Sequence, residues 1–243
     1  MYDIHAHILP GIDDGPRNST ESLEMVFEAS RCGTDVLVAT PHMRDVNEKR
    51  SVEYVTSSLN LLQHDIANYG VDIEIKIGME NHLNPDSPAM FKKGKSLTIN
   101  RTNFALIELP FFGHPKYIDD VLLELQHDGL IPVLAHPERI ELIQQDPTRL
   151  AYFIDKGMIS QVTAGSLIGQ FGQDVKSFTE QLIKNDLVHV IASDCHRPVG
   201  RRAPNITVGY QAAVRLIGHS RAKKLVCDNP ESIINGVRLS DNS

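Results

Sequence analysis

The sequence contains no tryptophan and only three cysteines among its 243 residues. Cys32, Cys195 and Cys227 are scattered, odd in number, and form no C-x-x-C pair. This scarcity argues against a disulfide framework and against a cysteine-based zinc motif, and it fits a reducing compartment. We therefore expect a cytoplasmic protein.

A positive net charge and long apolar segments are also absent. The chain has 24 Lys and Arg against 31 Asp and Glu, which gives a formal net charge of −7. Proteins that bind along a nucleic-acid backbone need a basic face, so we expect no nucleic-acid partner. No apolar run approaches the ~18 residues that span a bilayer, and the N-terminus lacks a basic and then apolar leader. We expect neither membrane insertion nor a signal peptide.

What the sequence does contain is a regular alternation of apolar runs with capped helical stretches. Runs such as 36–38 and 188–192 are apolar on both faces, which is typical of parallel strands covered by helices. No linker interrupts the alternation, so we expect a single α/β domain over 1–243, a closed barrel; a doubly wound open sheet is the alternative. The predicted strands are the first residues before Pro10, 35–40, 72–80, 104–110, 131–135, 159–163 and 188–193. The predicted helices are 19–32, 48–69, 117–128, 147–156, 173–185, 207–217, 220–227 and 230–235.

Polar residues gather at the carboxyl ends of these strands. His5 and His7 share one face of the first strand, because alternate side chains of a strand point the same way. Barrel enzymes place their chemistry at this end. The candidate metal ligands there are His5, His7, Asp14, His42, Glu80, Glu108, His136, Asp194 and His196. The alternative interpretation is that these side chains only cap helices or face solvent. However, nearly every predicted strand ends with a His, Asp or Glu, which favours a metal site.

Nine such side chains exceed what one ion uses, so we expect two or three divalent ions, with a carboxylate such as Glu80 bridging. Imidazoles and carboxylates without thiolates suit manganese, iron or zinc, and manganese is our first expectation. Clustered ions neutralise a phosphate ester and activate water near neutral pH. Cys195 lies between two candidate ligands, and we interpret it as a small buried apolar residue rather than a nucleophile.

Six short motifs carry a family resemblance. D-I-H-A-H, G-I-D-D-G, A-T-P-H, G-M-E, A-H-P-E-R and S-D-C-H occur in this order over nearly the whole chain. The sequence resembles the polymerase-and-histidinol-phosphatase (PHP) superfamily, in particular its metal-dependent bacterial protein-tyrosine phosphatases of capsule and exopolysaccharide operons. The resemblance implies a distorted (β/α)7 barrel with a trinuclear site. It implies one ion on His5, His7, Glu80 and Asp194, a second on Glu80, Glu108 and His136, and a third on Asp14, His42 and His196.

The same resemblance implies that Arg139 and Arg201 contact the substrate phosphate, although either arginine could instead pair with a carboxylate such as Glu138 or Glu141. The implied function is a protein-tyrosine phosphatase whose partner is a tyrosine-phosphorylated bacterial kinase. A small-molecule phosphatase, such as a histidinol-phosphate phosphatase, is the alternative enzyme. A non-enzymatic metal-binding module is a third hypothesis.

Several residues near the motifs receive a plainer interpretation. We read Asp13 as a turn residue beside Asp14, and Arg197 and Arg202 as charges on the rim. His82 and His114 are expected to be solvated or hydrogen-bonded, and Ser166 is a weak candidate for lining the pocket.

Overall fold

The computed structural model describes residues 1–239, without the side chain of Lys49. All its strand pairs are parallel, and they form two sheets in the orders β1-β2-β3 and β4-β5-β6-β7-β8. The strands are β1 Tyr2–Ala6, β2 Val36–Ala39, β3 Glu74–Ile77, β4 Asn81–His82, β5 Phe104–Glu108, β6 Ile131–Ala135, β7 Ile159–Thr163 and β8 Val190–Ala192.

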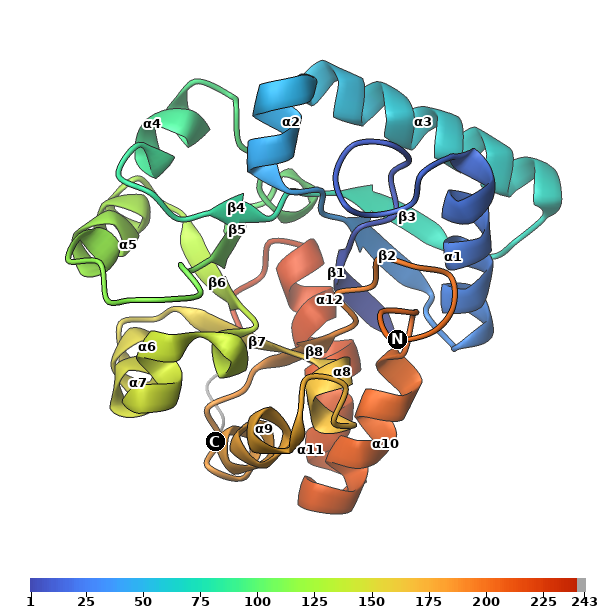
Figure 1. The fold of residues 1–243 in the computed structure, drawn as a ribbon. Coiled ribbons are helices and arrows are strands. Elements are labelled where there is room, and N and C mark those ends of the chain that lie inside the picture. Colours follow the sequence, from blue (N-terminus) through green and yellow to red (C-terminus); the bar gives the residue numbers. More distant parts are fainter. Residues whose placement is uncertain (240–243) are drawn as a thin grey trace.

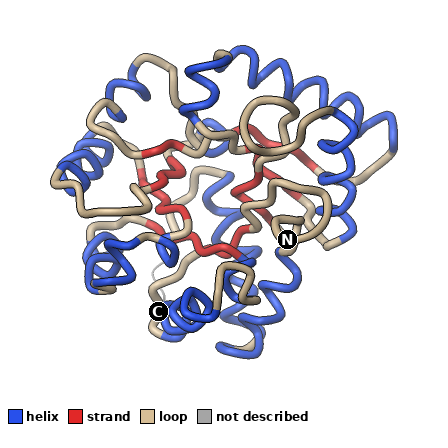
Figure 2. The backbone as a smooth tube through the Cα atoms, viewed as in Figure 1, coloured by secondary structure: helices blue, strands red, loops and turns tan. Residues whose placement is uncertain are grey.

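The two sheets join into a distorted barrel at two seams. One seam lies between β3 and β4: the predicted strand 72–80 forms β3, which pairs with β2, whereas β4 at 81–82 falls just beyond the predicted bounds and pairs with β5. Gly78 lets the chain after β3 pack closely against β2, since a Cβ there would lie 3.0 Å from the Val38 side chain. At the other seam the Asp194 N–H donates to the carbonyl of His5 at 2.9 Å. Figure 2 shows the resulting ring of strands, which confirms the expected barrel and not the open sheet.

Helices surround this ring on the outside, apart from α12, which lies behind the middle of the ring in this view (Figure 1). They are α1 Ser19–Arg31, α2 Met43–Lys49, α3 Val52–Tyr69, α4 Ser87–Lys92, α5 Tyr117–His127, α6 Glu141–Gln145, α7 Thr148–Asp155, α8 Ala164–Leu167, α9 Gln173–Lys184, α10 Ile206–Ile217, α11 His219–Lys223 and α12 Asn229–Ile234. Short 3₁₀ turns cover Ile99–Arg101 and Pro137–Arg139, and a π turn covers Lys224–Asp228. None of the described helices combines the length and the apolar character that a bilayer span needs.

The predicted helices are present, with local differences that have local causes. The stretch 48–69 is not one helix: α2 ends at Lys49, and Ser51 caps α3 by accepting the Tyr54 N–H. α1 begins where expected, because the Asn18 side chain accepts the Glu21 N–H. Side-chain caps thus set boundaries that apolar periodicity alone leaves open.

An apolar cluster fills the barrel below the polar strand ends. It contains Ile4, Leu106, Val133 and Val190, and α12 adds Ile233 from below. All five of these side chains are fully buried. A barrel plugged by apolar side chains at this level leaves its carboxyl end as the place for chemistry.

Candidate metal centre

Two histidines of β1 converge at the carboxyl end of the barrel. The register of β1 against β2 shifts between Asp3 and Ala6, as a β-bulge requires. Nε2 of His5 then lies 3.2 Å from Nε2 of His7, and both side chains are fully buried. The His5 Nδ1–H donates to Oε1 of Gln161 at 2.8 Å, so this ring turns its Nε2 toward the site.

The loop after β1 supplies the next two carboxylates. Gly15 lets it fold back tightly, since a Cβ there would lie 2.6 Å from the carbonyl oxygen of His7. Asp13 accepts the His7 Nδ1–H at 2.7 Å and the Gly15 N–H at 2.9 Å. Our interpretation of Asp13 as a turn residue was therefore incomplete, because its carboxylate also orients a candidate ligand. Asp14 points the other way, with Oδ1 3.1 Å from Nε2 of His196.

Glu80 lies at the centre of the cluster. Its Oε1 is 2.9 Å from Nε2 of His136 and 3.4 Å from Nε2 of His5. Its Oε2 is 2.8 Å from Nδ1 of His42 and 3.3 Å from Nε2 of His7. The Glu80 side chain is 1% exposed. One buried carboxylate therefore contacts four imidazoles, which matches the bridging position expected from the sequence.

The remaining candidates complete this arrangement. Oε1 of Glu108 is 3.6 Å from Nε2 of His136, and its Oε2 accepts a hydrogen bond from Nδ1 of His82 at 3.1 Å. His82 thus has the hydrogen-bonding role we expected. His136 and Asp194 both adopt the left-handed backbone region, with φ of 35° and 51°. This conformation costs non-glycine residues on the order of 1–3 kcal/mol and is concentrated at functional sites.

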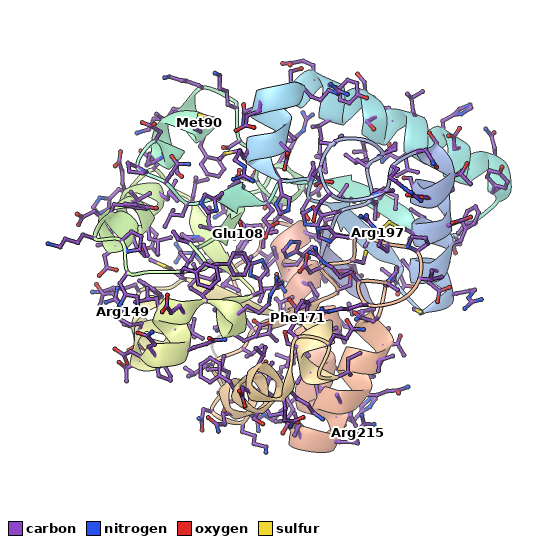
Figure 3. The ribbon with its side chains drawn as sticks, in the orientation of Figure 1. Met90, Glu108, Arg149, Phe171, Arg197 and Arg215 are labelled. Atoms are coloured by element: carbon purple, nitrogen blue, oxygen red, sulfur yellow. The ribbon has the colours of Figure 1, made fainter. Side chains whose placement is uncertain are left out.

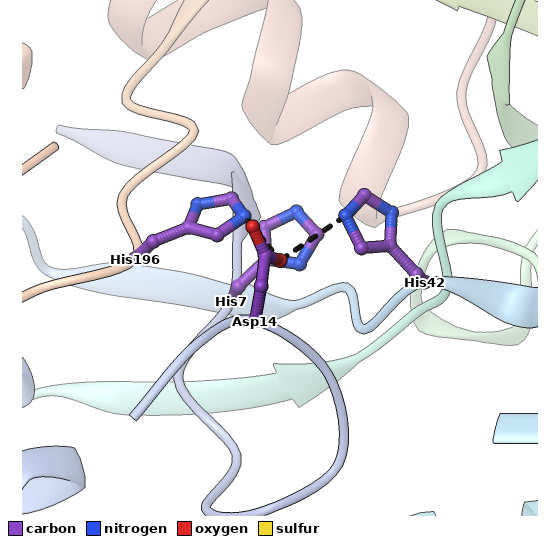
Figure 4. A group of neighbouring side chains, drawn as sticks. All are labelled: His7, Asp14, His42 and His196. Atoms are coloured by element: carbon purple, nitrogen blue, oxygen red, sulfur yellow. Dashed lines mark ion pairs between the residues drawn. The ribbon is translucent and has the colours of Figure 1, made fainter. Parts of the chain in front are cut away.

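Three groups of side chains have ligand atoms close enough for one ion each. The first group, drawn in Figure 4, places Asp14 between His42 and His196, with His7 behind them. The other two are His5, His7 and Glu80, and His42, Glu80 and Glu108. His136 and Asp194 adjoin these groups, and Oδ1 of Asp194 is 3.6 Å from Nε2 of His5. All nine predicted residues therefore lie around one site.

The buried carboxylates of the cluster shift the pKa values of its histidines. Burial opposes protonation of His5, but the carboxylates of Glu80 and Asp194 outweigh burial and raise its pKa to about 9. Burial likewise opposes a charge on His42, whose hydrogen bonds with Asp14 and Glu80 raise its pKa to about 11. Burial disfavours the Glu80 carboxylate, yet the surrounding histidines hold its pKa well below the usual range. Glu80 therefore stays ionised and attracts cations into the site.

This donor set fits divalent metal ions. Nε2 of His196 is buried, and although Oδ1 of Asp14 lies 3.1 Å away, no group among the described residues meets it in hydrogen-bond geometry. Such atoms lose solvation without compensation unless a cation satisfies them. Imidazole nitrogens and carboxylate oxygens together suit manganese, iron or zinc.

A cavity of about 480 Å³ opens beside the cluster and is rich in arginine. Figure 3 shows Phe171 and Arg197 near the middle of this end of the barrel, with Glu108 also in view. The lining residues are Asp14, Arg139, Phe171, His196, Arg197, Arg201 and Arg202. Both predicted phosphate arginines are among them. Arg139 pairs with Asp194, from Nη1 to Oδ2 at 2.8 Å, and not with Glu138 or Glu141.

Arg202 has a larger role than its interpretation as a rim charge allowed. Its Nη2 donates to Oδ1 of Asp194 at 3.0 Å, and its Nη1 lies 3.3 Å from Oδ2 of Asp14. Arg197 donates from Nη1 to the carbonyls of Asp14 and Gly15 at 2.7 and 2.6 Å. In the sequence, the only indication that Arg197 and Arg202 belong to the site is their position shortly after the S-D-C-H motif. Their hydrogen-bond partners are known only from the folded structure.

The end of β7 carries no candidate ligand, and instead it anchors the A-H-P-E-R turn. Oε1 of Glu138 accepts the Thr163 N–H at 2.9 Å and the Ser166 hydroxyl at 2.7 Å. Glu138 and Ser166 are fully buried, so Ser166 does not line the cavity as suggested. These bonds fix the turn that presents Arg139.

Cys195 and Arg201 stand in C-x5-R spacing, the spacing of cysteine-dependent phosphatases, which our sequence interpretation overlooked. The geometry decides against that chemistry. The Cys195 side chain is 0% exposed, and burial raises the pKa of its thiol. A nucleophilic cysteine needs a thiolate accessible to substrate. Cys195 is a buried apolar residue, as expected.

Comparison with known proteins agrees with this geometry. A family model described as "Capsular polysaccharide synthesis, CpsB/CapC" matches residues 1–235. The chain is 37% identical over 196 residues to the tyrosine-protein phosphatase YwqE of Bacillus subtilis, which covers 81% of this chain and 77% of the relative. It is 29% identical over 239 residues to the tyrosine-protein phosphatase CpsB of Streptococcus agalactiae, which covers 96% and 98%.

A solved structure gives the same result in three dimensions. It comes from crystal structures of YwqE from Bacillus subtilis and CpsB from Streptococcus pneumoniae, described as unique metal-dependent tyrosine phosphatases. The TM-score is 0.91 at 32% identity, and the match covers 99% of this chain and 96% of the other. With a barrel, a buried cluster of histidines and carboxylates, and near full-length similarity, the chain belongs to the CpsB/CapC family of capsular polysaccharide synthesis.

Proposed function

We propose that this chain is a metal-dependent tyrosine-protein phosphatase. The observation that carries the proposal is the position of the buried His and carboxylate cluster beside an arginine-lined cavity. Metal ligands and arginines in one pocket suit a phosphate ester, which is anionic at neutral pH. The relatives named tyrosine-protein phosphatase support the same substrate class.

The proposed ligand sets follow the family resemblance. His5, His7, Glu80 and Asp194 would hold one ion; Glu80, Glu108 and His136 a second; and Asp14, His42 and His196 a third. The observed grouping supports this division, with one difference: His7 also lies with the third set, its ring stacked on His196 with centroids 3.8 Å apart. We propose two or three ions per chain, with manganese as the first choice and iron or zinc as alternatives. When bound, they would supply charge neutralisation and activation of water.

The chain's own residues would bind and orient the ester. Arg139 and Arg201 offer forked donors that match phosphate oxygens, and Arg202 adds positive charge at the same wall. Holding the ester between arginines and ligands places the phosphorus against activated water, which makes the attack effectively unimolecular. No nucleophilic thiol takes part.

The proposed partner is a tyrosine-phosphorylated bacterial kinase that controls capsule or exopolysaccharide synthesis. The family description supports this setting. We further propose that the protein acts in the cytoplasm, since Cys32, Cys195 and Cys227 are all free thiols.

A substrate panel tests the proposal. The metal-loaded protein is assayed on phosphotyrosine peptides, phosphoserine peptides and histidinol phosphate, with manganese, iron and zinc compared in turn. We expect the highest kcat/KM on phosphotyrosine and a content of two or three ions by elemental analysis. A preference for histidinol phosphate would favour the small-molecule alternative, and inactivity on all three esters would contradict a phosphatase.

A further inference from the structure

We propose that Phe171 is a positioning residue, whose ring holds the guanidinium groups of Arg139 and Arg201 in place for phosphate. Cζ of Arg139 lies 4.3 Å from the centroid of the Phe171 ring, and Cζ of Arg201 lies 5.2 Å from it. One ring therefore contacts both arginines that the proposed function assigns to phosphate. The inference rests on that function for its substrate, but not for its geometry.

Arg139 and Arg201 depend on the Phe171 ring to different degrees, because their other contacts differ. Arg139 also lies over Phe111, with Cζ 5.2 Å from the ring centroid, and it pairs with Asp194. For Arg201, the described part of the chain provides no carboxylate partner. Its guanidinium group instead makes a cation–π contact with the Phe171 ring. Four arginines line this cavity, and their mutual repulsion drives unanchored guanidinium groups apart. An aromatic face attracts a cation without neutralising it, so the phosphate still meets full positive charge.

The ring itself is fixed by the backbone beneath it. A Cβ on Gly165, in α8, would lie 2.6 Å from Oε1 of Gln170 and 3.1 Å from Cε2 of Phe171, so glycine leaves room for both side chains. The Gln170 N–H donates to the carbonyl of Gly165 at 2.9 Å, which ties the loop before Phe171 to α8. Because the Phe171 ring is already fixed against α8, it loses little further conformational entropy when the two arginine side chains pack on it.

The alternative role for Phe171 is contact with the tyrosyl ring of the substrate. The two roles predict different results for inorganic phosphate, which has no ring. If Phe171 positions the arginines, replacing it weakens the binding of inorganic phosphate itself. If Phe171 stacks on the substrate, replacing it weakens only the binding of aryl phosphate esters.

The experiment measures binding of inorganic phosphate to the metal-loaded protein by calorimetry, together with kcat/KM on a phosphotyrosine peptide and on an alkyl phosphate. We expect Phe171→Leu, which keeps apolar bulk but removes the ring, to weaken phosphate binding about tenfold and to lower both kcat/KM values by a similar factor. Phe171→Tyr should restore near-native values. Phe112→Leu is the matched control, because the Phe112 side chain is 83% exposed and, within the described part of the chain, lies under no arginine.

A second variant guards against misfolding. Gly165→Ala keeps Phe171 but crowds its ring together with the Gln170 side chain, and we expect it to weaken phosphate binding while metal content stays unchanged; Gln170→Ala is the control for the second contact. Unchanged phosphate binding in Phe171→Leu, or a loss confined to the phosphotyrosine peptide, would overturn the inference. If instead the native protein binds phosphate through Phe171 but leaves phosphotyrosine intact, the proposed function fails and the inference stands.

Discussion

The Nδ1–H of His7 donates to Oδ2 of Asp13 at 2.7 Å, inside the turn that follows the first strand. This bond sets the tautomer of His7 and turns its Nε2 toward Glu80 and Asp194. Burial disfavours the Asp13 carboxylate, but its attraction to the His7 ring and its hydrogen bonds with His7 and the Gly15 N–H outweigh burial and lower the pKa of Asp13 to about 2. A carboxylate that stays ionised keeps this bond over the whole physiological range.

The Asp13–His7 bond predicts the effect of Asp13→Asn. An amide can still accept the hydrogen bond, but without charge it holds the ring less firmly. Removing such a supporting partner costs about 10- to 100-fold in metal affinity. Competition with a chelator measures that affinity, and Asp72→Asn, at an exposed position, is the control. Equal affinity in both variants would show that Asp13 only shapes the turn.

The activity of Cys195→Ser distinguishes a metal-dependent from a cysteine-dependent mechanism. Because its thiol is buried and protonated, Cys195→Ser should keep most activity. His136→Ala and Asp194→Ala should abolish hydrolysis with the fold intact, since each removes a proposed ligand. Circular dichroism checks the fold and elemental analysis the metal content. A Cys195→Ser protein that binds its metals but is inactive would revive the C-x5-R mechanism.

Arg139 and Arg201 should act on the binding of the substrate phosphate, and Arg201 should do so without affecting the metals. Arg139→Ala or Arg201→Ala should lower kcat/KM on phosphotyrosine peptides at least ~10-fold, since a hydrogen bond to a charged group contributes ~1.5–3 kcal/mol. Lysine at either position should rescue only partly, because an ammonium keeps the charge but lacks the fork. Metal content should not change in Arg201→Ala; Arg139→Ala also removes a partner of Asp194, a proposed ligand, so its kcat/KM is measured at saturating metal. Near-native kinetics in both alanine variants would make these arginines structural.

His189 predicts a pH dependence of stability that is independent of the metals. Burial lowers the pKa of this imidazole, whose Nδ1 accepts the Ser160 N–H at 3.2 Å. The unfolded chain therefore binds a proton more readily than the folded one, so this contribution is present above about pH 6.5 and is lost as the pH falls below it. His189→Asn keeps an acceptor but cannot titrate.

Urea unfolding of the chelator-treated protein between pH 7 and 5 measures this effect. The free energy of unfolding should fall less steeply with acidification in His189→Asn than in the native protein. Parallel curves for the two proteins would assign the acid sensitivity to other groups.

The sequence by itself determined the order of strands and helices and the identity of the clustered side chains. Strand periodicity and caps are local, so the Asn18 cap and the apolar run at 188–192 could be read without knowing the fold. The rule that parallel strands end on one face then predicted that His5 and Glu80, 75 positions apart in the chain, would meet.

Tertiary structure alone decided how those side chains are supported. The bulge in β1 and the close packing of Gly78 against β2 depend on contacts between strands, which no local pattern encodes. Asp13 looked like a turn residue and Arg202 like a rim charge because a sequence gives residue types but not partners. The partners come from loops that meet only when the barrel closes, and that closure turns nine scattered side chains into one site.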